Sequence, residues 1–156
     1  GTTILFAAKE MTELKNLTVI TASVSVSSIL SQNKFIDVVQ LGGIVRDSSV
    51  SVVGSFAENM LQYFNCSKLY MGADGVDLEF GVTTTNMMEA NLNRMMMGTA
   101  QKTILLVDSS KFGKRGFSKI CDLSGIDQII TDENIPQSYL ENLTELGIEV
   151  TVVKTE

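Results

Sequence analysis

The chain has 156 residues, 44% of them hydrophobic, so it is long enough and apolar enough to fold around a core of its own. Its net charge of −6 has the wrong sign for a domain that grips the phosphates of nucleic acid, and the absence of histidine excludes Ser-His-Asp and Cys-His catalysis. No apolar run approaches the roughly 18–20 residues that a membrane span needs.

The first half of the chain alternates between helix and strand. In chain order it predicts a helix over 4–14, a strand over 17–21, a short helix over 24–30, a strand over 36–41, a short strand or extended segment over 49–53 and a helix over 56–64. The first helix follows from an apolar stripe at helical spacing, and the strand over 17–21 follows from a β-branched run. Gly42 and Gly43 end the strand before them.

The second half continues the alternation. It predicts a strand over 69–71, a long helix over 85–101, a strand over 103–107, a looser stretch over 117–123, a strand over 126–131, a helix after Pro136 and a strand over 148–153. The strands are mostly continuous apolar runs, which is typical of parallel strands with helices as crossovers. We therefore expect one α/β domain over 1–156, with three layers: a mostly parallel sheet and helices on both faces.

Small and polar residues gather where the predicted strands end and the helices begin. Asp74 follows the strand over 69–71, threonines over 83–85 open the long helix, and Asp108 and Lys111 follow the strand over 103–107. In an open α/β sheet, ligands bind at the carboxyl ends of the strands. Helix N–H groups suit an anion, and a lysine adds a charge for a phosphate. The sequence therefore predicts a site for a small phosphorylated, hydroxyl-rich molecule.

Two segments near the amino end have more than one interpretation. Gly1-Thr2-Thr3 precedes the first helix, where it either cradles a phosphate or supplies a threonine N-cap. Arg46 follows Gly42-Gly43 and either binds a carboxylate or phosphate, forms a salt bridge to another domain or subunit, or lies on a surface turn.

The segments at the predicted sheet edge are also open to two interpretations. Thr83, Thr84 and Asn86 with Glu89 resemble a helix cap, but three consecutive threonines exceed what capping requires, and sugar hydroxyls would use the additional donors and acceptors. Asp108 and Lys111 form either a turn with an exposed ion pair or part of an anion site. The latter is favoured because Lys111, Lys114 and Arg115 concentrate positive charge within five positions.

The sulfur-containing residues suggest no cofactor chemistry. Cys66 and Cys121 have no metal-ligand neighbour at a suitable spacing, so we expect free thiols in a reducing, cytoplasmic setting, with no metal or cofactor and no membrane association. Met87 and Met97 lie off the apolar stripe of the long helix, which predicts a contact between the subunits of a homo-oligomer. The alternative is that both fill gaps under a neighbouring loop of a monomer.

Six motifs follow one another in a characteristic order. They are Gly42-Gly43-x-x-Arg46, Val53-Gly54, Gly72-Ala73-Asp74-Gly75, Thr83-Thr84-x-Asn86 with Glu89-Ala90, Asp108-Ser109-Ser110-Lys111-Phe112-Gly113, and Ile126-Asp127 with Thr131-Asp132. Each motif alone is weakly informative. Together they resemble the C-terminal sensor domain of DeoR-family transcriptional regulators, and the resemblance covers nearly the whole chain.

This resemblance implies a sugar-phosphate sensor of a transcriptional repressor of carbohydrate metabolism genes, with a fold similar to ribose-5-phosphate isomerase and glucosamine-6-phosphate deaminase. It implies a DNA-binding winged helix-turn-helix that is absent from this sequence, so that DNA is bound only through that missing part. It also implies that Gly1-Thr2-Thr3 is what remains of an Asp-x-Gly-Thr-Thr phosphate loop in an N-terminally truncated chain. The expected effector-binding residues are Gly1, Thr2, Thr3, Arg46, Asp74, Thr83, Thr84, Asn86, Glu89, Asp108 and Lys111.

The alternative is a sugar-phosphate isomerase or deaminase of the same fold. Ribose-5-phosphate isomerases resemble this chain around an Asp-Gly-Ala-Asp-Glu segment, where Met71-Gly72-Ala73-Asp74-Gly75 stands here. Neither Met71 nor Gly75 can transfer a proton, so we expect no catalytic residues and no enzyme activity. A second departure is Thr21-Ala22-Ser23, where members of the family usually carry Thr-Asn-Ser, and the lost amide alters the expected ligand contacts.

Overall fold

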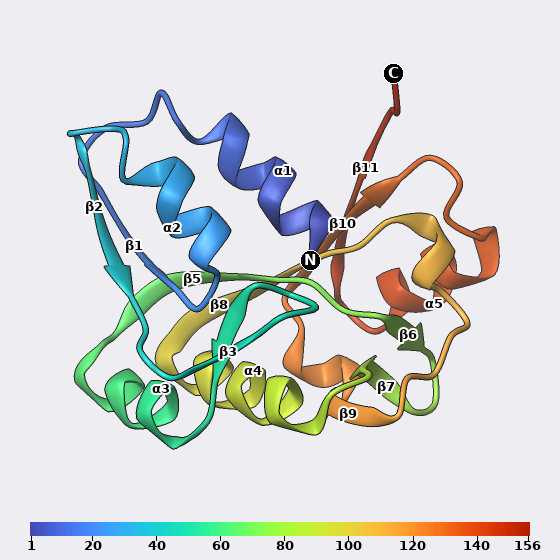
Figure 1. The fold of residues 1–156 in the computed structure, drawn as a ribbon. Helices are drawn as coiled ribbons and strands as arrows, with labels where there is room; N and C mark the ends of the chain where they lie inside the picture. Colours follow the sequence, from blue (N-terminus) through green and yellow to red (C-terminus); the bar gives the residue numbers. More distant parts are fainter. The chain divides into compact units, whose positions relative to one another are not determined.

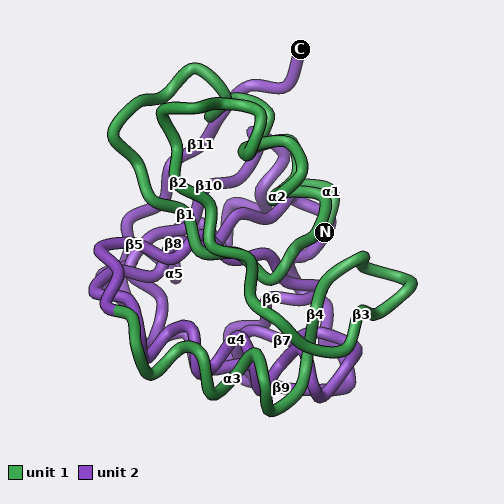
Figure 2. Tube along the Cα trace, turned by 60° about the vertical axis from the view of Figure 1, so that its left-hand side comes forward, with its two compact units in different colours: residues 1–64 green, residues 65–156 purple.

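The computed structural model describes all 156 residues, which divide into two compact units, Gly1–Phe64 and Asn65–Glu156 (Figure 2). Each unit has a buried hydrophobic cluster of its own. None of the helices combines the length and the apolar character that crossing a membrane would take. The prediction of one effector-sensing domain over 1–156 is not tested by this division and stays a prediction.

The first unit consists of short helices and two pairs of strands. Its elements are α1 (Thr2–Glu10), β1 (Leu17–Thr21), α2 (Val24–Leu30), β2 (Ile36–Gln40), β3 (Ile44–Arg46), β4 (Ser51–Val53) and α3 (Ser55–Met60), followed by a 3-10 turn over Leu61–Tyr63 (Figure 1). β1 and β2 are parallel, and Ala8, Val26, Leu30 and Ile36 form the buried cluster. The predicted strand over 17–21 and the predicted helix over 24–30 are confirmed with their bounds.

Residues 42–53 form a β-hairpin, where the sequence suggested a turn followed by a short strand or an extended segment; β4 is that short strand. β3 and β4 pair antiparallel, with Arg46 opposite Ser51. Gly43 has a φ of +151°, and a Cβ there would lie 2.7 Å from the Val53 carbonyl oxygen. The close approach of the two strands therefore requires a residue without a side chain at this position.

The second unit is built on a four-stranded parallel sheet in the order β11-β10-β8-β5. Its elements are β5 (Cys66–Met71), β6 (Gly75–Asp77), β7 (Gly81–Thr84), α4 (Met87–Thr99), β8 (Ala100–Leu106), a 3-10 turn over Ser109–Lys111, β9 (Ser118–Cys121), a 3-10 turn over Leu123–Gly125, β10 (Gln128–Asp132), α5 (Gln137–Glu145) and β11 (Glu149–Val153). The predicted α/β fold with a mostly parallel sheet and helices is confirmed.

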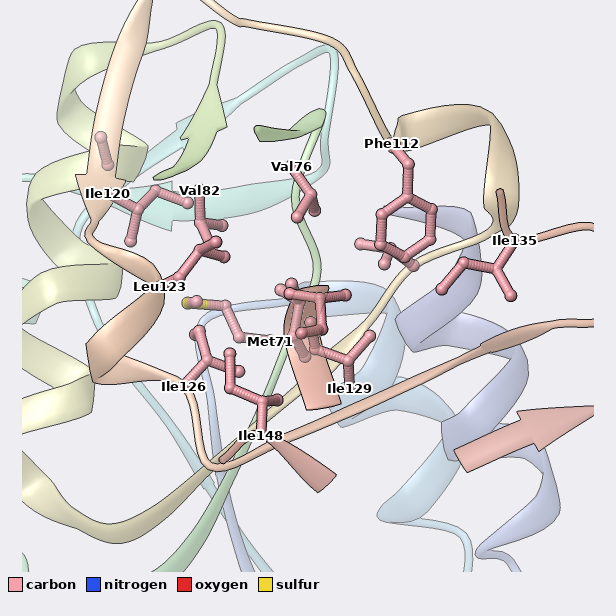
Figure 3. Close-up of a cluster of buried hydrophobic side chains, with 14 residues drawn as sticks. Met71, Val76, Val82, Phe112, Ile120, Leu123, Ile126, Ile129, Ile135 and Ile148 are labelled. Carbon is pink, nitrogen blue, oxygen red and sulfur yellow. The ribbon is translucent and has the colours of Figure 1, made fainter. Parts of the chain in front are cut away.

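The main core lies on one face of this sheet. Met71, Leu105 and Ile129, from three neighbouring strands, are all buried in one cluster, and Figure 3 shows Met71 and Ile129 together in it. Both long helices contribute to the same cluster, α4 with Ala90 and α5 with Leu143. Other labelled members are Val76, Val82, Phe112, Ile120, Leu123, Ile126, Ile135 and Ile148.

Met97 packs against this cluster, and a contact between subunits that involves it stays a prediction. Its methyl group would lie 3.0 Å from a Cβ added at Gly125, which shows how closely the chain approaches it. Met87 is different, because 67% of its surface is exposed.

A three-stranded antiparallel sheet in the order β6-β7-β9 was not predicted. The sequence placed the opening of a helix at the threonines and a looser stretch over 117–123, where the structure has β7 and β9. The strands are three or four residues long, too short for an alternating pattern to stand out. The long helix correspondingly starts at Met87 and ends at Thr99, and Ala100 already belongs to β8.

Candidate functional site

The carboxyl ends of β5, β8 and β10 lie at one edge of the parallel sheet, because these strands are parallel neighbours. An aspartate stands at or just beyond the end of each strand: Asp74, Asp108 and Asp132. The edge also carries Lys111. The second unit alone therefore brings carboxylates and a lysine to the place where open α/β sheets bind ligands.

Asp74 ties the end of β5 to the end of β7. Its Oδ2 accepts hydrogen bonds from the Thr84 hydroxyl at 2.8 Å and from the Thr85 N–H at 3.1 Å. Its own N–H donates to the Thr83 carbonyl at 2.9 Å. Thr84 is buried, whereas Asp74 is exposed, so the carboxylate faces solvent while being held by two donors.

Thr83 is completely buried, and its hydroxyl is engaged by the backbone. It accepts the Gly116 N–H at 2.7 Å and donates to the Gly75 carbonyl at 3.4 Å. In this conformation Thr83 connects two segments that border the site, and it offers no surface to a ligand.

Asn86 is the N-cap of α4. Its Oδ1 accepts the N–H groups of Met88 and Glu89, each at 3.0 Å. This cap stabilises the helix start, and it also uses two of the donors that an anion would need. Glu89 is half-buried in the first turn of the same helix. Thr84 and Asn86 thus lie at the junction of β7 and α4, and Asp74, which follows β5, is hydrogen-bonded to this junction.

Asp108 and Lys111 belong to one 3-10 turn at the end of β8. Asp108 Oδ1 accepts the Ser110 N–H at 2.9 Å and also the Ser110 hydroxyl. The hydroxyl of Ser110, followed by the Ser110 N–H and the charge of Lys111, holds the pKa of Asp108 below its ordinary value against the effect of partial burial. Lys111 is half-buried and forms no salt bridge.

Asp132 was missed as a site residue by the sequence reasoning. It is 8% exposed, and its two oxygens accept the Ser109 N–H at 2.7 Å and the Asn134 N–H at 3.0 Å. The pKa of Asp132 is lowered overall: burial alone would raise it, but the hydrogen bonds from Ser109 and Asn134 have the larger combined effect. The sequence feature that could have identified it is an aspartate at the end of an apolar strand. Its role is to hold the turn that carries Asp108 and Lys111.

The remaining predicted residues, Gly1, Thr2, Thr3 and Arg46, belong to the first unit. Gly1 occupies the N-cap position of α1, and no side chain caps this helix, so the threonine cap is not formed. Thr2 and Thr3 lie exposed in the first turn. Arg46 is half-buried at the end of β3. A site shared by these four residues and those of the second unit stays a prediction.

Two further features bear on the chemistry. No group of three or more His, Cys, Asp or Glu side chains is placed to hold a metal ion. A cleft of about 490 Å³ lies in the first unit, and none of the predicted site residues lines it. Its lining residues are Thr12, Glu13, Lys15, Ile29, Gln32, Asn33, Lys34 and Phe35. We therefore place the candidate site at the sheet edge, where the charged and hydroxyl-bearing groups converge.

Comparison with known proteins shows the family of the chain. The family described as the DeoR C terminal sensor domain matches residues 1–133. This chain belongs to that family. A protein of Escherichia coli O157:H7 that carries the name putative aga operon transcriptional repressor is 39% identical to the chain, over 98% of the chain and 57% of its own length. The HTH-type transcriptional regulator YulB of Bacillus subtilis is 34% identical over 98% of the chain and 59% of its own length.

A third relative, the HTH-type transcriptional repressor GlcR of Bacillus subtilis, is 29% identical over the whole chain and 60% of its own length. The chain thus spans between 57% and 60% of these three relatives.

Proposed function

We propose that this chain is the effector-sensing part of a DNA-binding transcriptional repressor of carbohydrate metabolism genes. The family assignment supports a sensor role, and the relatives are named as transcriptional regulators and repressors. DNA contact is assigned to a part of the protein outside this sequence, because the chain itself has a net charge of −6.

The effector that the sheet edge fits best is a sugar phosphate. The observation that carries this proposal is the turn over 108–111, where Lys111 offers an ammonium group that no carboxylate neutralises in a salt bridge. Such a group binds a phosphate. The exposed carboxylates of Asp74 and Asp108 accept hydrogen bonds, as sugar hydroxyls require. Gly1, Thr2, Thr3 and Arg46 are proposed as additional effector contacts from the first unit.

The site is proposed to bind without turnover. Met71 is 3% exposed and belongs to the hydrophobic core, so it supplies no acid or base. Asp74 accepts hydrogen bonds from a hydroxyl and a backbone N–H. The isomerase or deaminase alternative is not favoured, because proton transfer needs a positioned base and neither Met71 nor Gly75 supplies one.

A binding and turnover experiment tests the proposal. Thermal unfolding is followed with ribose 5-phosphate, glucosamine 6-phosphate, fructose 6-phosphate and inorganic phosphate, while the same samples are analysed for product. A hundredfold excess of ligand over its Kd should stabilise the fold by about 2.7 kcal/mol. Stabilisation by a sugar phosphate without product supports the sensor; product formation would establish the enzyme instead.

The sensor is also proposed to form a homo-oligomer, since paired operator half-sites are matched by symmetric protein subunits. Met87 supports this, because a largely exposed methionine suits an adaptable contact surface. Sedimentation equilibrium at about 100 μM should detect association through an interface of the usual size. A single 17.0 kDa species would contradict it.

A further inference from the structure

The loop after the 108–111 turn lies against the β6–β7 hairpin. The Gly113 N–H donates to the Val76 carbonyl at 2.8 Å, and the Gly116 N–H donates to the Thr83 hydroxyl at 2.7 Å. Phe112 forms a bridge with Val76 and is buried in the same cluster (Figure 3). The loop and the hairpin are therefore joined along residues 112–116.

The two backbones approach so closely that side chains are excluded at two positions. A Cβ at Gly75 would lie 2.3 Å from the Lys114 carbonyl oxygen, and a Cβ at Gly116 would lie 2.9 Å from the Thr84 carbonyl oxygen. A displacement of the loop would therefore be transmitted directly to the hairpin.

The Arg115 side chain adds further contacts between the loop and the β6–β7 hairpin. Its Nε lies 3.1 Å from Asp77 Oδ2, its Nη2 lies 3.4 Å from Glu79 Oε2, and its guanidinium is 5.7 Å from the centre of the Phe80 ring. Asp77 in turn accepts the N–H groups of Glu79 and Phe80 at 3.0 and 2.7 Å, which fixes the turn of the hairpin. One side chain thus connects the loop to a structured hairpin tip.

We propose that Arg115 is a positioning residue for the effector site: it keeps the turn carrying Asp108 and Lys111 in register with the turn carrying Asp74 and Thr84. The first turn begins the loop that Arg115 fastens, and the second turn lies at the base of the hairpin to which it is fastened. This inference rests on the proposed effector site. The side chain acts through the two turns and does not touch the effector.

The expected effect is modest, because the interaction is partly exposed. The Arg115 side chain is 52% exposed and that of Glu79 is 89% exposed, whereas that of Asp77 is 13% exposed. Exposed ion pairs contribute little, so we expect a loss of affinity of no more than about fivefold. Because the contribution to global stability is equally small, the variant protein should fold.

The test compares Arg115→Ala with Lys114→Ala. Both remove one positive charge from the same loop, but Lys114 is exposed and forms no salt bridge. Binding of ribose 5-phosphate, glucosamine 6-phosphate and fructose 6-phosphate is measured by calorimetry, and amide hydrogen exchange at Gly113 and Gly116 is measured without ligand. Arg115→Lys is the conservative variant, which keeps the charge without the planar fork.

Faster exchange at both glycines and weaker binding in Arg115→Ala, with neither change in Lys114→Ala and partial recovery in Arg115→Lys, would support the positioning role. Equal losses of affinity in both alanine variants would show a simple charge effect and overturn it. Unchanged exchange at Gly113 and Gly116 would also overturn it. If the wild-type protein binds none of the sugar phosphates, the proposed function fails, while the exchange result still decides whether Arg115 holds the loop.

Discussion

The two turns that border the candidate site differ in how their polar groups are used. At the junction of β7 and α4, Asp74 accepts hydrogen bonds from the Thr84 hydroxyl and the Thr85 N–H, and Asn86 caps α4, so that most of these polar groups support local structure. In the turn after β8, the carboxylates of Asp132 and Asp108 accept the N–H groups of Ser109 and Ser110, and Lys111 is left without a salt bridge. The comparison indicates that the first turn fixes the geometry of the candidate site, whereas the second supplies its positive charge.

The largest expected effect comes from removing the support of the charged turn. In Asp132→Asn, one of the two partly buried N–H groups of Ser109 and Asn134 loses its acceptor. We expect a loss of about 2 kcal/mol in the free energy of unfolding, or roughly 4–8 °C in Tm. Thermal and urea unfolding measure this loss, and sugar-phosphate affinity should fall as well.

Asp127→Asn is the matched control for this variant. Asp127 also accepts a strand N–H, that of Thr103 at 2.7 Å, but it precedes β10 and lies at the opposite edge of the sheet. Its replacement should affect stability without changing affinity. If both variants weaken binding equally, Asp132 has no particular connection with the site.

The next effect is on binding alone. Lys111→Ala should weaken a phosphorylated effector by about 1.5–3 kcal/mol, or roughly ten- to a hundredfold, because a charge-assisted hydrogen bond is lost. The melting curve without ligand should not change, since Lys111 forms no salt bridge. Calorimetry with the sugar phosphate that stabilises the wild-type protein measures the loss. Unchanged affinity with a normal melting curve would remove Lys111 from the site.

The parallel strands were predictable, whereas the antiparallel sheet was not. Runs such as that over 104–107 are apolar throughout, as strands covered on both faces must be, so their pattern alone identifies them. The strand that contains Thr83 and Thr84 could not be identified in this way. Hydroxyl residues near a helix start suggest a cap, yet their hydroxyls bond to Asp74 and to the backbone of segments distant in the sequence. Tertiary contacts of this kind leave no local pattern.

The candidate site shows the same limit. Asp74, Asp108 and Lys111 could be placed at the sheet edge, because they directly follow apolar runs. The support by Asp132 could not be seen, because its partner Ser109 is 23 positions away in the sequence. Arg115 was noticed only as part of a basic segment, since its pairing with Asp77 depends on a hairpin that the sequence did not reveal.

A smaller effect should sharpen the account of the first turn. Asn86→Ala removes the acceptor for two N–H groups of α4 and should cost about 1 kcal/mol of stability. If this turn only fixes the geometry of the site, the loss in the free energy of effector binding should not exceed this loss of stability. Asn86→Ser is the matched variant, because serine also caps helices and should restore stability. A large loss of affinity in Asn86→Ser with restored stability would assign Asn86 a direct effector contact.

The smallest effect concerns the protonation of the charged turn. The Ser110 hydroxyl is the largest cause of the lowered pKa of Asp108, whose ordinary value is 3.8. A carboxylate with a folded pKa below its unfolded value adds stability above the unfolded pKa, and this contribution is lost as the pH falls through the folded value. Ser110→Ala should therefore raise the pKa of Asp108 toward 3.8 and reduce the pH dependence of unfolding below that pH. NMR titration of the Asp108 carboxyl carbon measures the first effect, and acid unfolding measures the second.

Ser109→Ala is the control, because the backbone N–H of Ser109, which donates to Asp132, remains in the variant. An Asp108 pKa that moves as far in Ser109→Ala as in Ser110→Ala would show that the turn as a whole, and not the Ser110 hydroxyl, keeps this carboxylate ionised.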